Sequence, residues 1–301
     1  ETTTTNGDAA TTTTEGETAT TTTEAPVPQS KWDYEYDFDS EEEMADFAAY
    51  WQATRDAEGG GYNASVKEDW KAHWELKDGK LVRSNLDKTE GATPGSISNN
   101  AMLYLTKEQI PYFEAEVSFS FGDSWGWPQF NFGSKELGAA VLRSGAGVWM
   151  SMQGEVYAAH NGMDTNDKLT DGAYDANFKK GDEHTYKVRV IKGEKANEIL
   201  LSIAVKANDG EFKTIVENHS IVDENLGGYI SLQAQNDNLS FNSLKIQKLN
   251  ADGSDWNAED GDGKPTSPST GVSGSAIPAL LMLGAGAAFV AAYAFSKKGS
   301  K

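Results

Sequence analysis

Three segments of the chain alternate apolar residues with uncharged polar or aromatic residues, a pattern that is able to bind a ligand. Residues 127–132 read Trp-Pro-Gln-Phe-Asn-Phe, residues 148–153 read Val-Trp-Met-Ser-Met-Gln, and residues 229–235 read Tyr-Ile-Ser-Leu-Gln-Ala-Gln. Successive side chains of a strand point to opposite faces, so each segment predicts one apolar face and one face of amides, hydroxyls and aromatic rings. A face that only meets water would more often carry Lys, Glu and Thr.

The chemistry of these faces suits sugars, because the apolar C–H face of a pyranose ring stacks on an indole and its hydroxyls pair with amides. The candidate ligand-binding residues are Trp125, Trp127, Gln129, Asn131, Trp149, Gln153, Gln233 and Gln235. Trp125 belongs to a loop at residues 122–126, where it has few packing options. A strand register shifted by one residue would instead place Trp127 and Trp149 in the core, and this alternative stays open.

Catalysis is the competing hypothesis. Glu114 and Glu116 lie two residues apart on one predicted strand, which places their Cβ atoms about 7 Å apart. Glycoside hydrolysis needs two carboxylates at roughly 5–10 Å. The strand continues as Val-Ser without a further acid, which favours a solvated polar face. No catalytic residue is therefore assigned.

Composition excludes several other kinds of chemistry. The chain has no cysteine, so it has no thiolate nucleophile and no Cys-ligated zinc. A formal net charge of −20 argues against nucleic acid as a partner, since nucleic acid needs a basic surface. The four histidines show no metal-ligand spacing, and no metal or cofactor is assigned. Aspartates at positions 164, 167, 171 and 175 are able to bind calcium, but their spacing matches no EF-hand loop and favours solvated turns.

The elements that must position these residues are mostly short strands. Residues 113–121, 185–190 and 199–205 alternate with period two, and Asn208-Asp209-Gly210 predicts a hairpin turn into residues 211–216. Asp78-Gly79 predicts another turn, between residues 74–76 and 81–83. One short N-terminal helix is predicted from a capping box of Ser40 and Glu43, followed by apolar residues at helical spacing (Met44, Phe47, Ala48 and Trp51). Together these elements predict an all-β, two-sheet antiparallel sandwich.

Several motifs resemble the concanavalin A-like and laminin-G-like jelly rolls. They are Tyr36-Asp37-Phe38-Asp39, Trp74-x-Leu76-x-x-Gly79-x-Leu81, Gly181-Asp182-x-His184-x-Tyr186-x-Val188, and the closing pair at residues 228–233 and 239–246. The closing pair resembles the branch that holds certain carbohydrate-binding modules and 3-keto-disaccharide hydrolase-like domains. The resemblance implies a ligand surface on the concave sheet or its rim. Laminarinase-type members carry Glu-x-Asp-x-Glu, which the strand at Glu114 lacks.

The ends of the chain predict display outside a cell. Residues 1–30 form a Thr-rich spacer expected to be disordered, residues 31–250 the jelly-roll domain, and residues 251–275 an acidic, Pro-Ser-Thr linker. Residues 276–301 combine an apolar run at 277–295, long enough for a transmembrane helix, with a basic tail, which the positive-inside rule places in the cytoplasm. A processed wall anchor, a simple membrane anchor or a buried helix accounts for this pattern.

Ser267-Pro268-Ser269-Thr270-Gly271 before the apolar run resembles the cell-wall sorting signal of Gram-positive surface proteins, with Ser267 where the family has Leu. The resemblance implies that a sortase cleaves between Thr270 and Gly271 and joins Thr270 to peptidoglycan. The leading hypothesis is thus a non-catalytic, wall- or membrane-anchored protein on the extracellular face that captures a polysaccharide or host glycan. A glycoside-processing enzyme and a protein-binding adhesin using the loop at 122–128 are the alternatives.

Overall fold

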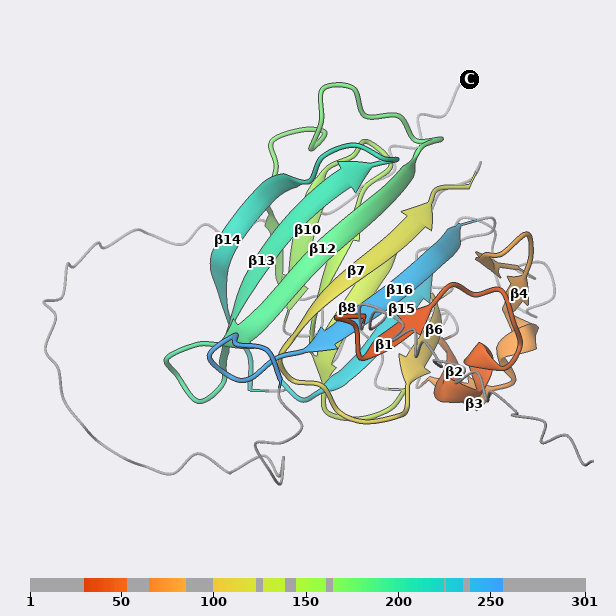
Figure 1. Cartoon of the computed structure of the whole chain (residues 1–301), viewed down its shortest axis with the longest axis horizontal. Helices are drawn as coiled ribbons and strands as arrows, with labels where there is room; N and C mark the ends of the chain where they lie inside the picture. The colour runs from red at the N-terminus through yellow and green to blue at the C-terminus, as the bar shows by residue number, and fades with distance from the viewer. Residues whose placement is uncertain are drawn as a thin grey trace, which may run out of the picture. The chain divides into compact units, whose positions relative to one another are not determined.

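The chain forms an all-β sandwich of two antiparallel sheets (Figure 1). The computed structural model describes residues 30–52, 65–84, 100–122, 127–138, 145–160, 165–224, 226–234 and 239–256, all within one compact unit. The predicted spacer up to residue 29, the sorting motif and the apolar run at 277–295 lie outside these residues. Within the described ranges, no helix is long and apolar enough to cross a membrane.

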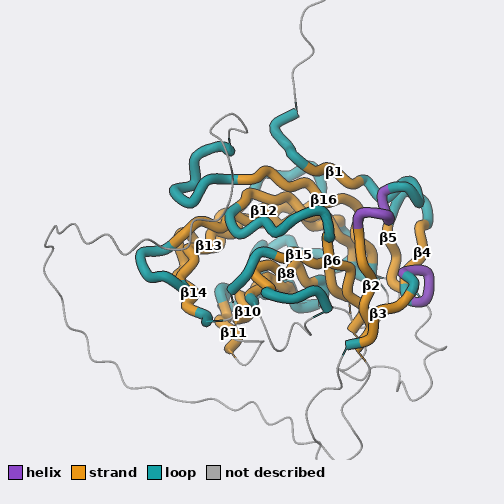
Figure 2. The backbone as a smooth tube through the Cα atoms, turned by 90° about the horizontal axis from the view of Figure 1, so that it is seen from below, coloured by secondary structure: helices purple, strands orange, loops and turns teal. Residues whose placement is uncertain are grey.

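Over the described residues each sheet has eight strands, and all strand pairings are antiparallel. Sheet A runs in the order β14 (Lys213–Val222), β13 (Glu198–Ala207), β12 (Glu183–Lys192), β7 (Phe113–Ser120), β16 (Ser240–Lys248), β5 (Leu81–Arg83) and β4 (Trp74–Leu76), with β1 (Tyr34–Tyr36) also paired to β16. Sheet B runs β11 (Thr165–Lys168), β10 (Val156–His160), β9 (Ala146–Met150), β8 (Gln129–Ser134), β15 (Tyr229–Ala234), β6 (Asn100–Leu105), β2 (Phe47–Gln52) and β3 (Val66–Glu68). Figure 2 shows β12 and β16 in one layer and β8 and β15 in the other.

The core lies between the inner faces of the two sheets. In β7, Phe113, Ala115, Val117 and Phe119 all point inward and are fully buried, which confirms the predicted alternation. Phe130, Val148 and Leu232 fill the facing positions of sheet B. Because inner and outer residues alternate along each strand, this core fixes which side chains reach the outer faces.

The predicted turns also form. Asp78 and Gly79 adopt positive φ angles of 54° and 67° between β4 and β5. Asn208 has a φ of 48°, and the Gly210 N–H donates to the Ala207 carbonyl across the β13–β14 turn. β14 begins at Lys213, two residues later than predicted.

The predicted N-terminal helix is wrong. Residues 43–46 form one turn of 3₁₀ helix, η1 (Glu43–Asp46), and the chain then enters β2. Glu43 does reach back as in a capping box, but its carboxylate accepts from the N–H groups of Asp37 and Asp39. β2 pairs with β6 on one side and β3 on the other, so ladder hydrogen bonds outweigh the local helical pattern. A second 3₁₀ turn, η2 (Trp70–Ala72), precedes β4.

Candidate functional site

One cross-strand row of side chains runs over the outer face of sheet B through all eight strands. The paired residues, from β11 to β3, are Lys168, Tyr157, Trp149, Gln129, Gln233, Met102, Tyr50 and Lys67. A second row contains Asn166, Ala159, Gly147, Asn131, Ser231, Tyr104 and Ala48. The register therefore puts Trp149, Gln129, Asn131 and Gln233 on one face, opposite the core.

Three aromatic rings form a stack on this face. The rings of Trp149 and Tyr157 are parallel within 4°, with centroids 4.0 Å apart. Trp127, just before β8, adjoins this pair with its ring tilted by 38° to that of Trp149 and the two centroids 5.3 Å apart. Because β9 lies between β8 and β10, Trp149 is the middle ring. All three side chains are partly exposed, so a ligand reaches the rim of the stack rather than an isolated Trp149 face.

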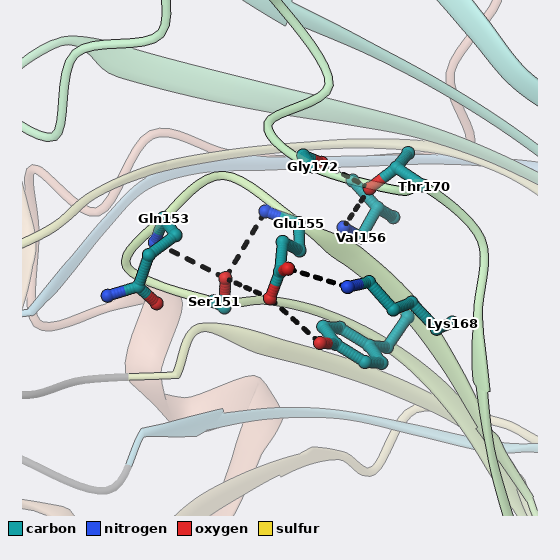
Figure 3. A network of polar contacts seen from close by, with 8 residues as sticks. Ser151, Gln153, Glu155, Val156, Lys168, Thr170 and Gly172 are labelled. Atoms are coloured by element: carbon teal, nitrogen blue, oxygen red, sulfur yellow. Dashed lines mark hydrogen bonds and ion pairs between the residues drawn. The ribbon is translucent and has the colours of Figure 1, made fainter.

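Hydrogen bonds hold two of these rings in place. The Trp149 indole Nε1 donates to Asn166 Oδ1 at 3.1 Å. The Tyr157 hydroxyl donates to Glu155 Oε2 at 2.8 Å, and Lys168 Nζ approaches Glu155 Oε1 at 2.7 Å (Figure 3). The stack is thus oriented before any ligand arrives, which lowers the ordering cost of binding.

The turn that carries Glu155 is itself well defined. Ser151 Oγ accepts from the N–H groups of Gln153 and Glu155, and the Ser151 N–H donates to the Glu155 carbonyl (Figure 3). Gly154 has a φ of +80°, and a Cβ there would come within 2.7 Å of the Phe178 ring, so both backbone and space require glycine. The predicted strand at 148–153 ends at Met150, and Gln153 lies exposed at the turn rather than on the strand face.

The charge states of the network follow from these contacts. The hydrogen bonds from Lys168 and Tyr157 outweigh burial and hold the pKa of Glu155 below its ordinary value. Burial and the hydrogen bond to Glu155 raise the pKa of Tyr157 to about 12. At neutral pH the carboxylate is therefore ionised and the phenol is a donor.

The amides beside the stack are buried rather than open to solvent. Gln129, Asn131 and Gln233 are 1%, 6% and 0% exposed. Asn131 and Gln233 belong to a chain of amide hydrogen bonds that all run in one direction. Asn131 Nδ2 donates to Gln233 Oε1, Gln233 Nε2 donates to Asn100 Oδ1, and Asn100 Nδ2 donates to Gln52 Oε1. These amides hold the strands of the face together, and the exposed polar groups belong to the turn and to β11.

The structure thus divides the predicted residues into groups. Trp127, Trp149 and Gln153 reach solvent, and Gln129, Asn131 and Gln233 lie beneath the surface. Trp125, Gln235, Thr270 and Gly271 lie outside the described residues. The sequence reasoning missed Tyr157, Glu155, Asn166 and Lys168. A hairpin at Ser151–Glu155, had it been recognised from Gly154, would have paired Tyr157 with Trp149.

The outer face of sheet A differs from that of sheet B in its charges. Acids and lysines alternate across β1, β16, β7 and β12 as Glu35, Lys245, Glu116 and Lys187. Glu114 Oε1 lies 2.9 Å from Lys31 Nζ and 3.2 Å from Lys187 Nζ. Burial raises the pKa of Glu114, but the Lys31 hydrogen bond and both lysine charges outweigh it and lower the pKa. A general acid needs the opposite shift, so the lowered pKa of Glu114 does not fit that role.

The aspartate-rich region contains carboxylates that already have partners. Asp167 Oδ2 lies 2.9 Å from His219 Nε2 and 3.2 Å from His160 Nε2. Asp175 pairs with Lys213 and accepts from the Asn177 N–H. Across the described ranges, no group of three or more His, Asp and Glu residues is placed to hold a metal ion.

Comparisons with known proteins give only distant structural likenesses. No protein-family model matches the chain, and no curated protein matches it. A non-specific endo-β-1,3(4)-glucanase is 12% identical with a TM-score of 0.40, covering 71% of this chain and 89% of its own. Peanut lectin is 12% identical with a TM-score of 0.39, covering 71% and 95%. A Flavobacterium laminarinase is 11% identical with a TM-score of 0.40, covering 71% and 99%. At these values the likenesses carry no argument for function, which must be argued from the residues themselves.

Proposed function

We propose that the chain is a concanavalin A-like carbohydrate-binding protein that captures a polysaccharide or host glycan without cleaving it. The observation that carries this proposal is the partly exposed stack of Trp127, Trp149 and Tyr157 on the outer face of sheet B. Aromatic rings supply apolar area to the C–H faces of a sugar. The exposed Gln153 at the neighbouring turn carries an amide that is able to pair with hydroxyls.

The experiment is affinity electrophoresis of the whole chain in gels that contain a β-glucan, a galactomannan or a mucin. Retardation by at least one polymer is expected, with no reducing sugar released. Trp149→Ala removes the middle ring and is expected to weaken the affinity at least about tenfold, or 1.4 kcal/mol. Trp256→Ala is the matched control, because Trp256 is exposed but follows β16 of sheet A.

Tyr157→Phe is a second, milder variant, included because Trp149→Ala could lose affinity through a folding defect. It keeps the ring and removes only the hydrogen bond to Glu155, so a smaller loss of affinity is expected. Equal binding by wild type, Trp149→Ala and Trp256→Ala would reject the proposed site. Release of reducing sugar that stops in Glu114→Gln or Glu116→Gln would instead identify a hydrolase. Neither binding nor turnover would favour a protein-binding adhesin.

We also propose that the protein is displayed on the outer surface of a Gram-positive cell. The support comes from the sequence: the Pro-Ser-Thr-Gly motif at 268–271, the apolar run at 277–295 and the basic tail that follows it. Attachment is to peptidoglycan through Thr270 or to the membrane through the apolar run.

A further inference from the structure

Two charged side chains lie at the Tyr157 end of the ring stack, on the outer face of sheet B. Glu155 accepts the hydrogen bond of the Tyr157 hydroxyl, and Lys168 is the cross-strand partner of Tyr157 on β11. Both are partly exposed, with side-chain exposures of 23% for Glu155 and 43% for Lys168. A ligand that covers the rim of the stack therefore comes within reach of both charges.

The two charged groups form an ion pair with each other. Lys168 Nζ and Glu155 Oε1 are 2.7 Å apart, while Glu155 Oε2 holds the hydroxyls of Tyr157 and Ser151 (Figure 3). Both oxygens of the carboxylate are occupied, so its position is fixed. A ligand anion near Lys168 would meet a lysine already paired, and it would lie beside a fixed negative charge.

We infer that Glu155 is a specificity-determining residue of this site, which restricts the ligand to neutral glycans and rejects glycans bearing carboxylate or sulfate groups. This inference rests on the proposed function, since it concerns what the same site accepts. Repulsion between two anions a few ångströms apart at a partly exposed site changes an affinity by about tenfold.

A purely structural role for Glu155 makes a different prediction. Glu155→Gln keeps an oxygen that accepts from Tyr157 and removes the negative charge. If Glu155 only positions Tyr157, its replacement changes the affinities for neutral and acidic glycans together, and their ratio stays constant. If Glu155 sets specificity, its replacement lowers the ratio of the affinity for the neutral glycan to that for the acidic glycan. The ratio of two affinities is therefore the readout that separates the two roles.

The test uses the whole chain and two probes. One is whichever of the β-glucan and the galactomannan the wild type retards more, and the other is the same polymer oxidised to the carboxylate at its primary hydroxyls. In Glu155→Gln, the neutral-to-oxidised affinity ratio is expected to fall about tenfold, because Lys168 becomes available to the carboxylate. Adding Lys168→Met to that variant is expected to restore the ratio. Salt is expected to weaken the gained binding.

Glu211→Gln is the matched control, since it removes the same charge from an exposed position before β14, on sheet A. Its ratio is expected to equal that of the wild type. A ratio in Glu155→Gln that matches Glu211→Gln would overturn the inference and leave the proposed function standing. A wild-type chain that binds mucin but neither the β-glucan nor the galactomannan would also overturn the inference. A wild-type chain that binds none of the three polymers would overturn the proposed function as well.

Discussion

Tyr157 is fixed by three different interactions, although no long pattern surrounds it in the sequence. Its ring stacks on Trp149, its hydroxyl bonds to Glu155, and its backbone pairs with Lys168. Aromatic pairs of this kind contribute about 0.5–1.5 kcal/mol beyond their buried area. The ring is therefore held by its neighbours rather than by burial in the core, and this suits a surface that must meet ligand without rearranging.

His184 is the opposite case, an ionisable side chain enclosed by aromatic rings. It is fully buried, and the Phe178 ring stacks on it with centroids 5.0 Å apart. The Tyr174 hydroxyl donates to Nδ1 at 2.9 Å, and Nε2 donates to the Lys179 carbonyl at 3.1 Å. A neutral imidazole satisfies both contacts. Burial lowers the pKa of His184, and the Lys179 hydrogen bond and nearby acids only partly offset it.

The free energy of unfolding is expected to depend on pH through His184. An unfolded histidine titrates near 6.5, so the contribution is complete above that pH and is lost as pH falls toward the lower folded pKa. His184→Gln removes this titration. Urea unfolding at about pH 7.5 and about pH 5 should show a smaller loss in the variant, by up to about 1.4 kcal/mol per pH unit. Equal losses in both proteins would contradict the role of His184, because His73 titrates in both.

At the scale of elements, residues 43–52 and 113–120 show what the sequence could predict. The alternation in β7 is long and unbroken, and its buried set matches the prediction. Apolar residues at 44, 47, 48 and 51 fit helical spacing, but in β2 it is Ala49 and Trp51 that face the core. Pairing with β6, from a segment about fifty residues away, decided the outcome. The hydrophobic periodicity of residues 43–52 does not indicate which distant strand they pair with.

The same limit applies to the candidate site. The face of Gln129, Asn131 and Gln233 followed from alternation, but their burial depends on what packs over them, which no local pattern encodes. The Trp149–Tyr157 pair depends on the register of a hairpin, and that register is set by a turn whose glycine has positive φ. Pattern therefore predicted which residues share a face, and three-dimensional packing decided which of them reach solvent.

β11 is a short edge strand that joins the two sheets. Asn166 points outward and orients Trp149, whereas Asp167 points inward and contacts His160 of β10 and His219 of β14. β14 belongs to sheet A, so this carboxylate links the open edges of the sandwich. β11, which supplies the hydrogen-bond acceptor of Trp149 on its outer face, is thus held on its inner face by the contacts of Asp167.

Asp167→Ala is expected to lower the free energy of unfolding by about 0.5–1.5 kcal/mol, because two hydrogen bonds to a partly exposed carboxylate are lost. Hydrogen exchange should accelerate at the amides of β11 and change little in β12 and β13. Asp171→Ala is the control, since Asp171 is an exposed aspartate only four residues away. Identical exchange in the two variants would show that the link does not hold β11.

At the scale of the whole molecule, the two outer faces have opposite chemistry. Sheet A carries alternating acids and lysines, whereas the middle strands of sheet B carry rings, amides and hydroxyls, with Lys168 and Lys67 on its two edge strands. A net charge of −20 keeps such a protein soluble and repels anionic partners. Specific capture of a neutral polymer by one face, with the other in water, is compatible with this distribution.

Surface display is tested by cell fractionation in a Gram-positive host that has sortase. The wild-type chain is expected in the fraction that a muramidase releases from the wall. Thr270→Ala blocks cleavage between Thr270 and Gly271, so the variant is expected in the membrane fraction, held by residues 277–295. Recovery of both proteins from the wall would refute processing at this motif. Recovery of both from the membrane would identify a simple anchor.

The described chain begins and ends beside the last residues of β16. The Asp33 N–H donates to the Ile246 carbonyl, and the Trp256 N–H donates to the Lys248 carbonyl. Chain segments joined before residue 30 and after residue 256 therefore pull on the sandwich at one place, on sheet A. Mechanical load that passes between them does not cross sheet B. The ring stack of Trp127, Trp149 and Tyr157 thus lies outside the path of a load that is applied between these two segments.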